Sequence, residues 1–115
     1  MITRIESGPR MSQAVVHGNT VYLAGQVASD LSADTGGQTR EVLAAIDELL
    51  AQAGTDKRHL LAATIYLTDM STFNEMNAVW DAWIAPGCAP ARATVGAPLA
   101  SSAYRVEIVV TAARP

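Results

Sequence analysis

Cationic side chains and cysteine are both scarce in this chain of 115 residues. There is one lysine, no run of Lys or Arg stands out, and the formal net charge is −3. Because nucleic-acid binding needs a concentrated patch of positive charge, this composition argues against a nucleic-acid partner. The single cysteine, Cys88, excludes a disulfide within the chain. Since no signal peptide is recognisable either, a reducing cytoplasm is the expected location.

Long apolar runs and clustered metal ligands are also missing. No apolar run reaches the ~18 residues that indicate a membrane span, so no membrane partner is expected. His17, His59 and Cys88 are too widely spaced to form a recognisable metal motif, and we expect no metal and no other cofactor. Apolar residues make up 50% of the chain. That share is enough for one core, and we expect a single domain over residues 1–115.

Hydrophobic periodicity predicts six strands and two helices in the order β-β-β-α-β-α-β-β. The strands are expected over residues 2–6, 12–17, 20–26, 59–68, 91–97 and 104–113. Helices that alternate with strands are typical of an α+β fold, in which both helices pack on one face of a mixed sheet.

The helix ends are predicted from capping residues. The sequence Thr-Gly-Gly-Gln at 35–38 matches a capping box, and Gly54 is a suitable C-terminal stop. Asp69 or Ser71 can cap the second helix, and the Pro-Gly pair at 86–87 ends it. The inward face of that helix is expected to comprise Phe73, Met76, Trp80, Trp83 and Ile84.

Two charged residues, Arg92 and Glu107, stand on strands that are otherwise apolar or small. Charged side chains are rare on largely buried strands unless they form an ion pair or serve in binding or catalysis. An arginine fork matches a carboxylate, and a glutamate beside it can move protons, so the two residues suggest a small pocket for an anionic metabolite. A structural ion pair remains the alternative interpretation, because the spacing alone does not separate the two.

The two-residue period of a strand assigns these side chains to faces. Arg92, Thr94 and Gly96 share one face of their strand. Val106, Ile108 and Val110 share one face of the last strand, and Glu107 lies on the other face. If the helices cover the first face, Glu107 is left on a side that faces either solvent or an interface. The apolar Val109 beside it favours an interface.

Asn77 is the third unusual residue, because it lies on or beside the apolar stripe of the second predicted helix. A buried amide without partners costs roughly 1–3 kcal/mol. Asn77 therefore either contributes to a site or is a satisfied amide that fixes the helix to a neighbouring loop.

Several short motifs together resemble the YjgF/RidA family of small enamine/imine deaminases, also labelled endoribonuclease L-PSP. The motifs are Gly8-Pro9, Ser12-Gln13-Ala14-Val15, Gly25-Gln26, Gln38-Thr39, Met76-Asn77-Ala78 and Pro90-Ala91-Arg92 … Val106-Glu107-Ile108. The match spans nearly the whole chain and looks most like a divergent branch of the family.

The resemblance implies a chorismate-mutase-like fold and a homotrimer with active sites between subunits. It also implies hydrolysis of reactive 2-enamine or 2-imine carboxylates to 2-keto acids and ammonia. In that reading Arg92 holds the carboxylate of a small metabolite, and Glu107 positions or activates water. The backbone around Thr94 helps to bind the carboxylate, and Asn77 lines or supports the site.

Three positions depart from the pattern of the well-characterised deaminases. Met11 replaces a tyrosine, Ala24 a serine and Thr94 a cysteine, so two hydroxyl groups are lost from the expected substrate site. A non-catalytic or regulatory protein that binds a small carboxylate is therefore the alternative function. Ribonuclease activity, the family's other label, is disfavoured by the acidic balance of the chain.

Overall fold

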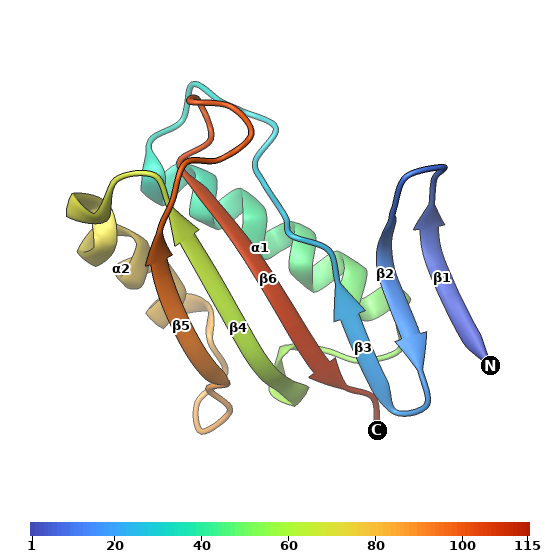
Figure 1. The fold of residues 1–115 in the computed structure, drawn as a ribbon. Helices are drawn as coiled ribbons and strands as arrows, with labels where there is room; N and C mark the ends of the chain where they lie inside the picture. The colour runs from blue at the N-terminus through green and yellow to red at the C-terminus, as the bar shows by residue number, and fades with distance from the viewer.

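The fold is a single mixed sheet with two helices on one face (Figure 1). The computed structural model describes all residues, 1–115. The strands are β1 (Ile2–Ser7), β2 (Ser12–His17), β3 (Thr20–Leu23), β4 (Leu60–Leu67), β5 (Ala91–Gly96) and β6 (Val106–Ala113). Helix α1 spans Thr35–Gln52 and helix α2 spans Phe73–Trp83, with short 3₁₀ turns at Lys57–His59 and Met70–Thr72. The predicted α+β class and element order are confirmed.

The strand order in the sheet is β1-β2-β3-β6-β4-β5. The last strand, β6, lies between β3 and β4 and is antiparallel to both. The β4 and β5 strands are parallel. A parallel pair needs a crossover connection, and α2 supplies it. This order leaves β1 and β5 as the two edge strands, at opposite ends of the sheet.

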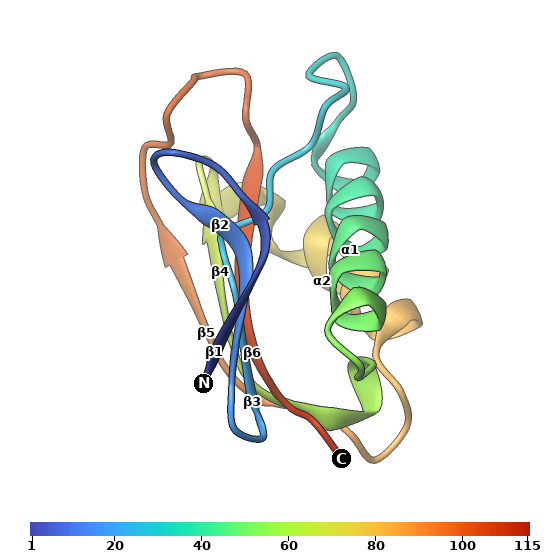
Figure 2. The same ribbon diagram turned by 90° about the vertical axis from the view of Figure 1, so that its right-hand side faces the viewer.

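The core lies between the helices and the sheet face that they cover (Figure 2). Period-two alternation explains this arrangement, because Val106, Ile108 and Val110 on β6 are all buried as predicted. The most buried apolar side chains of the helices are Val42, Leu43, Ile46, Leu50 and Met76. The opposite sheet face carries no helix. No helix in the fold is long and apolar enough to cross a membrane.

The start of α1 differs from the predicted capping box. Asp34 is the N-cap, and its Oδ1 accepts a hydrogen bond from the Gly37 backbone N–H at 2.8 Å. Thr35 is already inside the helix and is buried. The Gln38 side chain accepts a hydrogen bond from the Arg105 N–H at 2.8 Å and so ties α1 to the chain before β6. The capping-box prediction is wrong because an aspartate one residue earlier occupies the cap.

Other predicted boundaries move by a few residues. Gly54 follows the α1 cap with a φ of 84°, as expected for a C-terminal stop. The prediction that Asp69 or Ser71 caps the second helix is wrong, because a 3₁₀ turn intervenes and the N-cap of α2 is Thr72. Asp69 instead caps that turn, where its Oδ1 accepts from the Ser71 N–H at 2.9 Å. The β3 strand ends at Leu23 instead of residue 26, and β6 begins at Val106 instead of residue 104.

Candidate functional site

Arg92 lies on the helix-covered side of the edge strand β5. Its Cα partner on β4 is Ala63, a buried core residue, so both side chains face the helices. The guanidinium carbon Cζ stands 5.3 Å from the centroid of the Trp80 ring on α2. Both ion pairs in the structure involve Asp56, and neither includes Arg92. The guanidinium therefore keeps its N–H groups available for an anion.

Two polar atoms in the same part of the fold lack partners within the protomer. The Oγ1 of Thr94 and the Oδ1 of Asn77 are buried and accept no hydrogen bond. Thr94 pairs with the core residue Ile65, so its side chain faces the same side as Arg92. Asn77 precedes Trp80 by one turn of α2. An unsatisfied buried polar atom costs roughly 1–3 kcal/mol, so both atoms are unusual for the interior of a protomer.

Glu107 lies on the uncovered face of the sheet, as predicted. It alternates with the buried Val106 and Ile108, and its Cα partner is Tyr66 of β4. The carboxylate rests against the backbone of Gly25, where an added Cβ would lie 2.9 Å from the Glu107 Cδ. Real Cβ atoms do not approach so closely, so a larger residue at position 25 would displace the Glu107 carboxylate. The sequence marked Gly25 as part of a motif but gave no sign of this contact.

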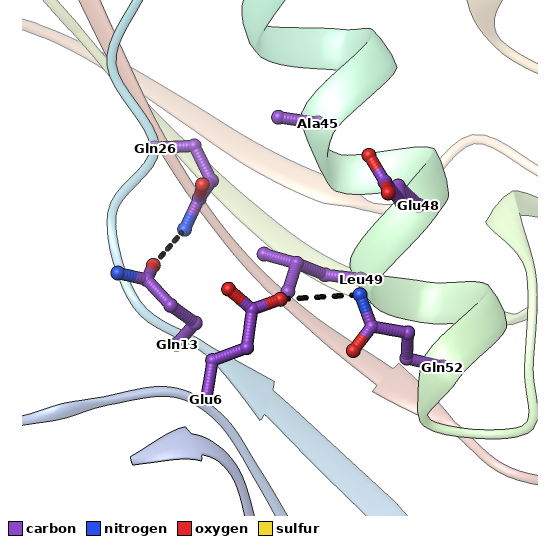
Figure 3. A pocket seen from close by; sticks show the side chains of 7 residues that line it. All are labelled: Glu6, Gln13, Gln26, Ala45, Glu48, Leu49 and Gln52. Carbon is purple, nitrogen blue, oxygen red and sulfur yellow. Dashed lines mark hydrogen bonds between the residues drawn. The ribbon is translucent and has the colours of Figure 1, made fainter. Parts of the chain in front are cut away.

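Two glutamine side chains hold the Gly25 segment in place (Figure 3). The Gln26 Nε2 donates to the Gln13 Oε1 and to the Ala24 carbonyl, each at 3.0 Å. The Gln26 backbone forms an isolated bridge with Ile108, through hydrogen bonds of 2.9 and 3.1 Å. This bridge fixes Gly25 beside Glu107, and it explains why the extended chain continues past the end of β3.

Arg92 and Glu107 do not meet within one protomer. Arg92 faces the helices from the sheet edge, and Glu107 faces away from them on β6. The alternative of a structural ion pair between the two is therefore wrong for the single chain. Arg92 and Thr94 share the helix-covered face of β5, and Arg92 reaches Trp80 on α2. Asn77 lies on α2 one turn before Trp80, and Glu107 lies with Gly25 on the other face of the sheet.

Met11 and Ala24 lie far along the sheet from β5. Met11 precedes β2 and its side chain is 49% exposed. Ala24 is half-buried, and its N–H donates to the Gln13 carbonyl at 2.9 Å. Ala24 adjoins Gly25 and so belongs to the Glu107 side. No contact joins Met11 or Ala24 to Arg92 inside the protomer, because β2 and β3 are separated from β5 by β6 and β4.

A separate polar cleft of about 330 Å³ lies between the N-terminal hairpin and α1 (Figure 3). Its lining comprises Glu6, Gln13, Gln26, Ala45, Glu48, Leu49 and Gln52. The Gln52 Nε2 donates to the Glu6 Oε2 across this cleft at 3.1 Å. None of the predicted site residues lines it. No group of three or more His, Cys, Asp or Glu side chains is placed to hold a metal ion.

Comparison with known proteins identifies the family. The family model described as Endoribonuclease L-PSP matches residues 1–114. This chain belongs to that family, which is also named YjgF/RidA. A RutC family protein of Haemophilus ducreyi is 48% identical to it over 113 residues, with 98% of this chain and 97% of that protein covered. The RutC family protein YoaB of Escherichia coli K12 is 46% identical over 97% of each chain.

Solved structures of the YjgF/RidA family share the fold. A YjgF family member from Neisseria meningitidis has a TM-score of 0.97 at 46% identity, covering 100% of this chain and 96% of that one. An uncharacterised protein from Pseudomonas aeruginosa has a TM-score of 0.98 at 43% identity, covering 100% of both chains. The chorismate-mutase-like fold expected from the resemblance is confirmed, and membership of the YjgF/RidA family fits a deaminase or related small-molecule role.

Proposed function

We propose that this protein is a hydrolytic deaminase of reactive 2-enamine or 2-imine carboxylates, which it converts to 2-keto acids and ammonia. The observation that carries the proposal is the Arg92 guanidinium, which forms no ion pair and lies over the Trp80 ring. An arginine whose N–H groups are free matches a carboxylate in a bidentate way. We also propose that the protein acts in the cytoplasm, as its single cysteine leads us to expect.

The chemistry needs positioning and one proton relay. Arg92 fixes the substrate carboxylate, with the backbone at Thr94 as a further donor and Asn77 supporting the site. The substrate reacts as its protonated imine. Glu107 orients a water molecule and takes one of its protons as the oxygen adds to the imine carbon, which gives a neutral carbinolamine. Glu107 then returns that proton to the nitrogen, the C–N bond breaks to release ammonia, and the hydroxyl proton passes to Glu107 and on to solvent as the 2-keto acid forms.

The proposed assembly is the homotrimer that the family resemblance implies, and a site shared between subunits fits the location of Arg92 and Glu107 on different sides of one protomer. The uncovered sheet face carries Val15, Tyr22, Tyr66, Val95 and Val109, which alternate with the core residues. Of these, Tyr22 is 50% and Val95 43% exposed. A large exposed apolar patch marks an interaction surface. A second copy on this face brings the Arg92 of one protomer towards the Glu107 of its neighbour.

A coupled assay tests the proposal. An amino-acid oxidase or a dehydratase generates the imine, and keto-acid release is followed for several amino acids. We expect the wild type to accelerate release, and Arg92→Ala and Glu107→Gln to reduce that acceleration about 100-fold, as is typical for loss of a positioned charge or proton carrier. Arg40→Ala, an exposed arginine of α1, serves as the matched control. Absence of any difference between the wild type and Arg92→Ala would contradict the proposal.

The second candidate is a non-catalytic or regulatory protein that binds a small carboxylate. Met11 and Ala24 favour it, because neither side chain can orient water or donate a hydrogen bond. Thermal-shift measurements with keto acids separate the two functions. Stabilisation that depends on Arg92, without turnover by any oxidase-generated imine, supports the binding protein.

A further inference from the structure

Trp80 lies directly beneath the arginine on which the proposed function depends. The Arg92 Cζ is 5.3 Å from the Trp80 ring centroid, inside the ~6 Å range of a cation–π contact. Trp80 is 4% exposed, so its ring is held by the core. We propose that Trp80 is a positioning residue, whose indole face holds the Arg92 guanidinium in the orientation that receives a carboxylate. This inference rests on the proposed function, in which Arg92 is the carboxylate clamp.

An aromatic platform suits an anion clamp better than an acidic partner does. A carboxylate partner would bind the N–H edge of the guanidinium, which is the edge that a substrate carboxylate needs. A ring face contacts the flat side of the guanidinium and leaves that edge free. A long arginine side chain without a fixed partner loses rotamer freedom when it binds, and a preformed platform reduces that loss.

The Trp80 ring is itself held in place by its neighbours. The centroids of Trp80 and Trp83 are 5.5 Å apart, with the ring planes tilted by 51°. The Trp83 Nε1 donates to the Asp47 Oδ2 of α1 at 2.9 Å, and the Lys57 Nζ lies 5.2 Å from the Trp83 centroid. A connected series of contacts thus runs from α1 through α2 to the guanidinium at the sheet edge.

Substitutions at Trp80 test the platform, with calorimetric binding of 2-ketobutyrate as the readout. Trp80→Leu keeps an apolar side chain but removes the ring, and we expect the dissociation constant to rise about tenfold. Trp80→Phe keeps a ring face and should rescue most of that loss. The matched control Phe73→Leu removes another partly buried ring of α2 and should change binding by less than about threefold, because the cation–π contact of Arg92 is with Trp80.

A double-mutant cycle separates positioning from general damage to the fold. If Trp80 acts through Arg92, Trp80→Leu combined with Arg92→Ala binds 2-ketobutyrate no more weakly than Arg92→Ala alone. Additive losses would overturn the proposal. So would a Trp80→Phe variant as weak as Trp80→Leu, or wild-type affinity in a folded Trp80→Leu protein.

Fluorescence provides a readout that requires neither catalysis nor a stable Trp80→Leu protein. In a Trp83→Phe background, Trp80 is the one remaining tryptophan of the two in the chain. Replacing Arg92 with Gln removes the cation from the ring and should shift the Trp80 emission, and an unchanged spectrum would overturn the contact. If 2-ketobutyrate binds Arg92→Ala as it binds the wild type, the proposed function fails, and the emission result still decides whether Trp80 holds Arg92.

Discussion

Both faces of the sheet carry apolar side chains, but the protomer covers only one of them. On the covered face Ile65 and Ile108 are 0% exposed. On the other face Val95 is 43% and Tyr22 50% exposed, and Glu107 stands among such residues. The covered face belongs to a hydrophobic core that is complete within one chain. The open face mixes apolar side chains with Thr64, Glu107 and Thr111 and has no cover, which is typical of a surface that another molecule completes.

A charge in the middle of the open face is the strongest test of this difference. Val109→Asp places a carboxylate where the proposed trimer excludes water. An unpaired buried charge costs roughly 3–5 kcal/mol, so we expect the assembly to dissociate. Sedimentation velocity measures the change, and Ala51→Asp on the exposed side of α1 is the control. A wild type that sediments as a monomer would refute the assembly itself.

A cavity in the covered face should act within the single chain. Ile65→Ala removes a fully buried side chain from β4. Large-to-small changes of this kind cost about 2–5 kcal/mol of unfolding free energy. Urea denaturation measures it, and the neighbouring Thr64→Ala, on the open face, should cost much less in a monomeric background. Equal costs for the two variants would mean that the faces do not differ as described.

The contact between Gly25 and Glu107 offers a smaller and more local test. Gly25→Ala forces the carboxylate or the backbone to move, and overpacking of this kind costs about 1–3 kcal/mol. We expect lower deaminase turnover as well, because Glu107 is displaced. Gly8→Ala is the matched control, since its nearest heavy atom would be the Met11 carbonyl oxygen at 3.6 Å. Unfolding curves and turnover of both variants provide the comparison.

The smallest expected effect concerns the exposed turn that leads into α2. The Ser71 hydroxyl, and then the Ser71 N–H, donate hydrogen bonds that lower the pKa of Asp69 from its ordinary 3.8. A lowered pKa contributes stability above the ordinary value, and that stability is lost as the pH falls through the folded-state pKa. Asp69→Asn should therefore lower the Tm slightly near pH 7, with the difference disappearing in acid. Ser71→Ala should reproduce part of the effect, and a difference that grows in acid would contradict it.

Local pattern predicted much of this fold. Alternation along β6 correctly separated Val106 and Ile108 from Glu107, because a strand with one covered face must alternate. Strand β2 was predicted with both of its ends. The capping box failed because Asp34, an intrinsically better N-cap than Thr35, lies one residue before the Thr-x-x-Gln pattern. The end of β3 was missed because the bridge from Gln26 to Ile108 joins residues that are distant in sequence.

The site was harder to predict than the fold, for a physical reason. The two-residue period of a strand assigns each side chain to one of the two faces of that strand. It does not show which faces of two different strands lie on the same side of the sheet. That relation depends on register, in which Arg92 lies opposite Ala63 and Glu107 opposite Tyr66. The Trp80 platform likewise arises from the packing of α2 on the β5 edge. No spacing along the chain indicates it.

The placement of Arg92 and Glu107 on opposite sides of one sheet has a genetic consequence. In the proposed closed ring, Arg92 of each protomer contributes to the site shared with one neighbour. Glu107 of the same protomer contributes to the site shared with the other neighbour. Protomers that carry Arg92→Ala and protomers that carry Glu107→Gln are each inert alone. Any mixed ring of three still contains one junction where an intact arginine meets an intact glutamate. Two defective alleles in one cell would therefore complement each other, to about a third of full activity per mixed ring.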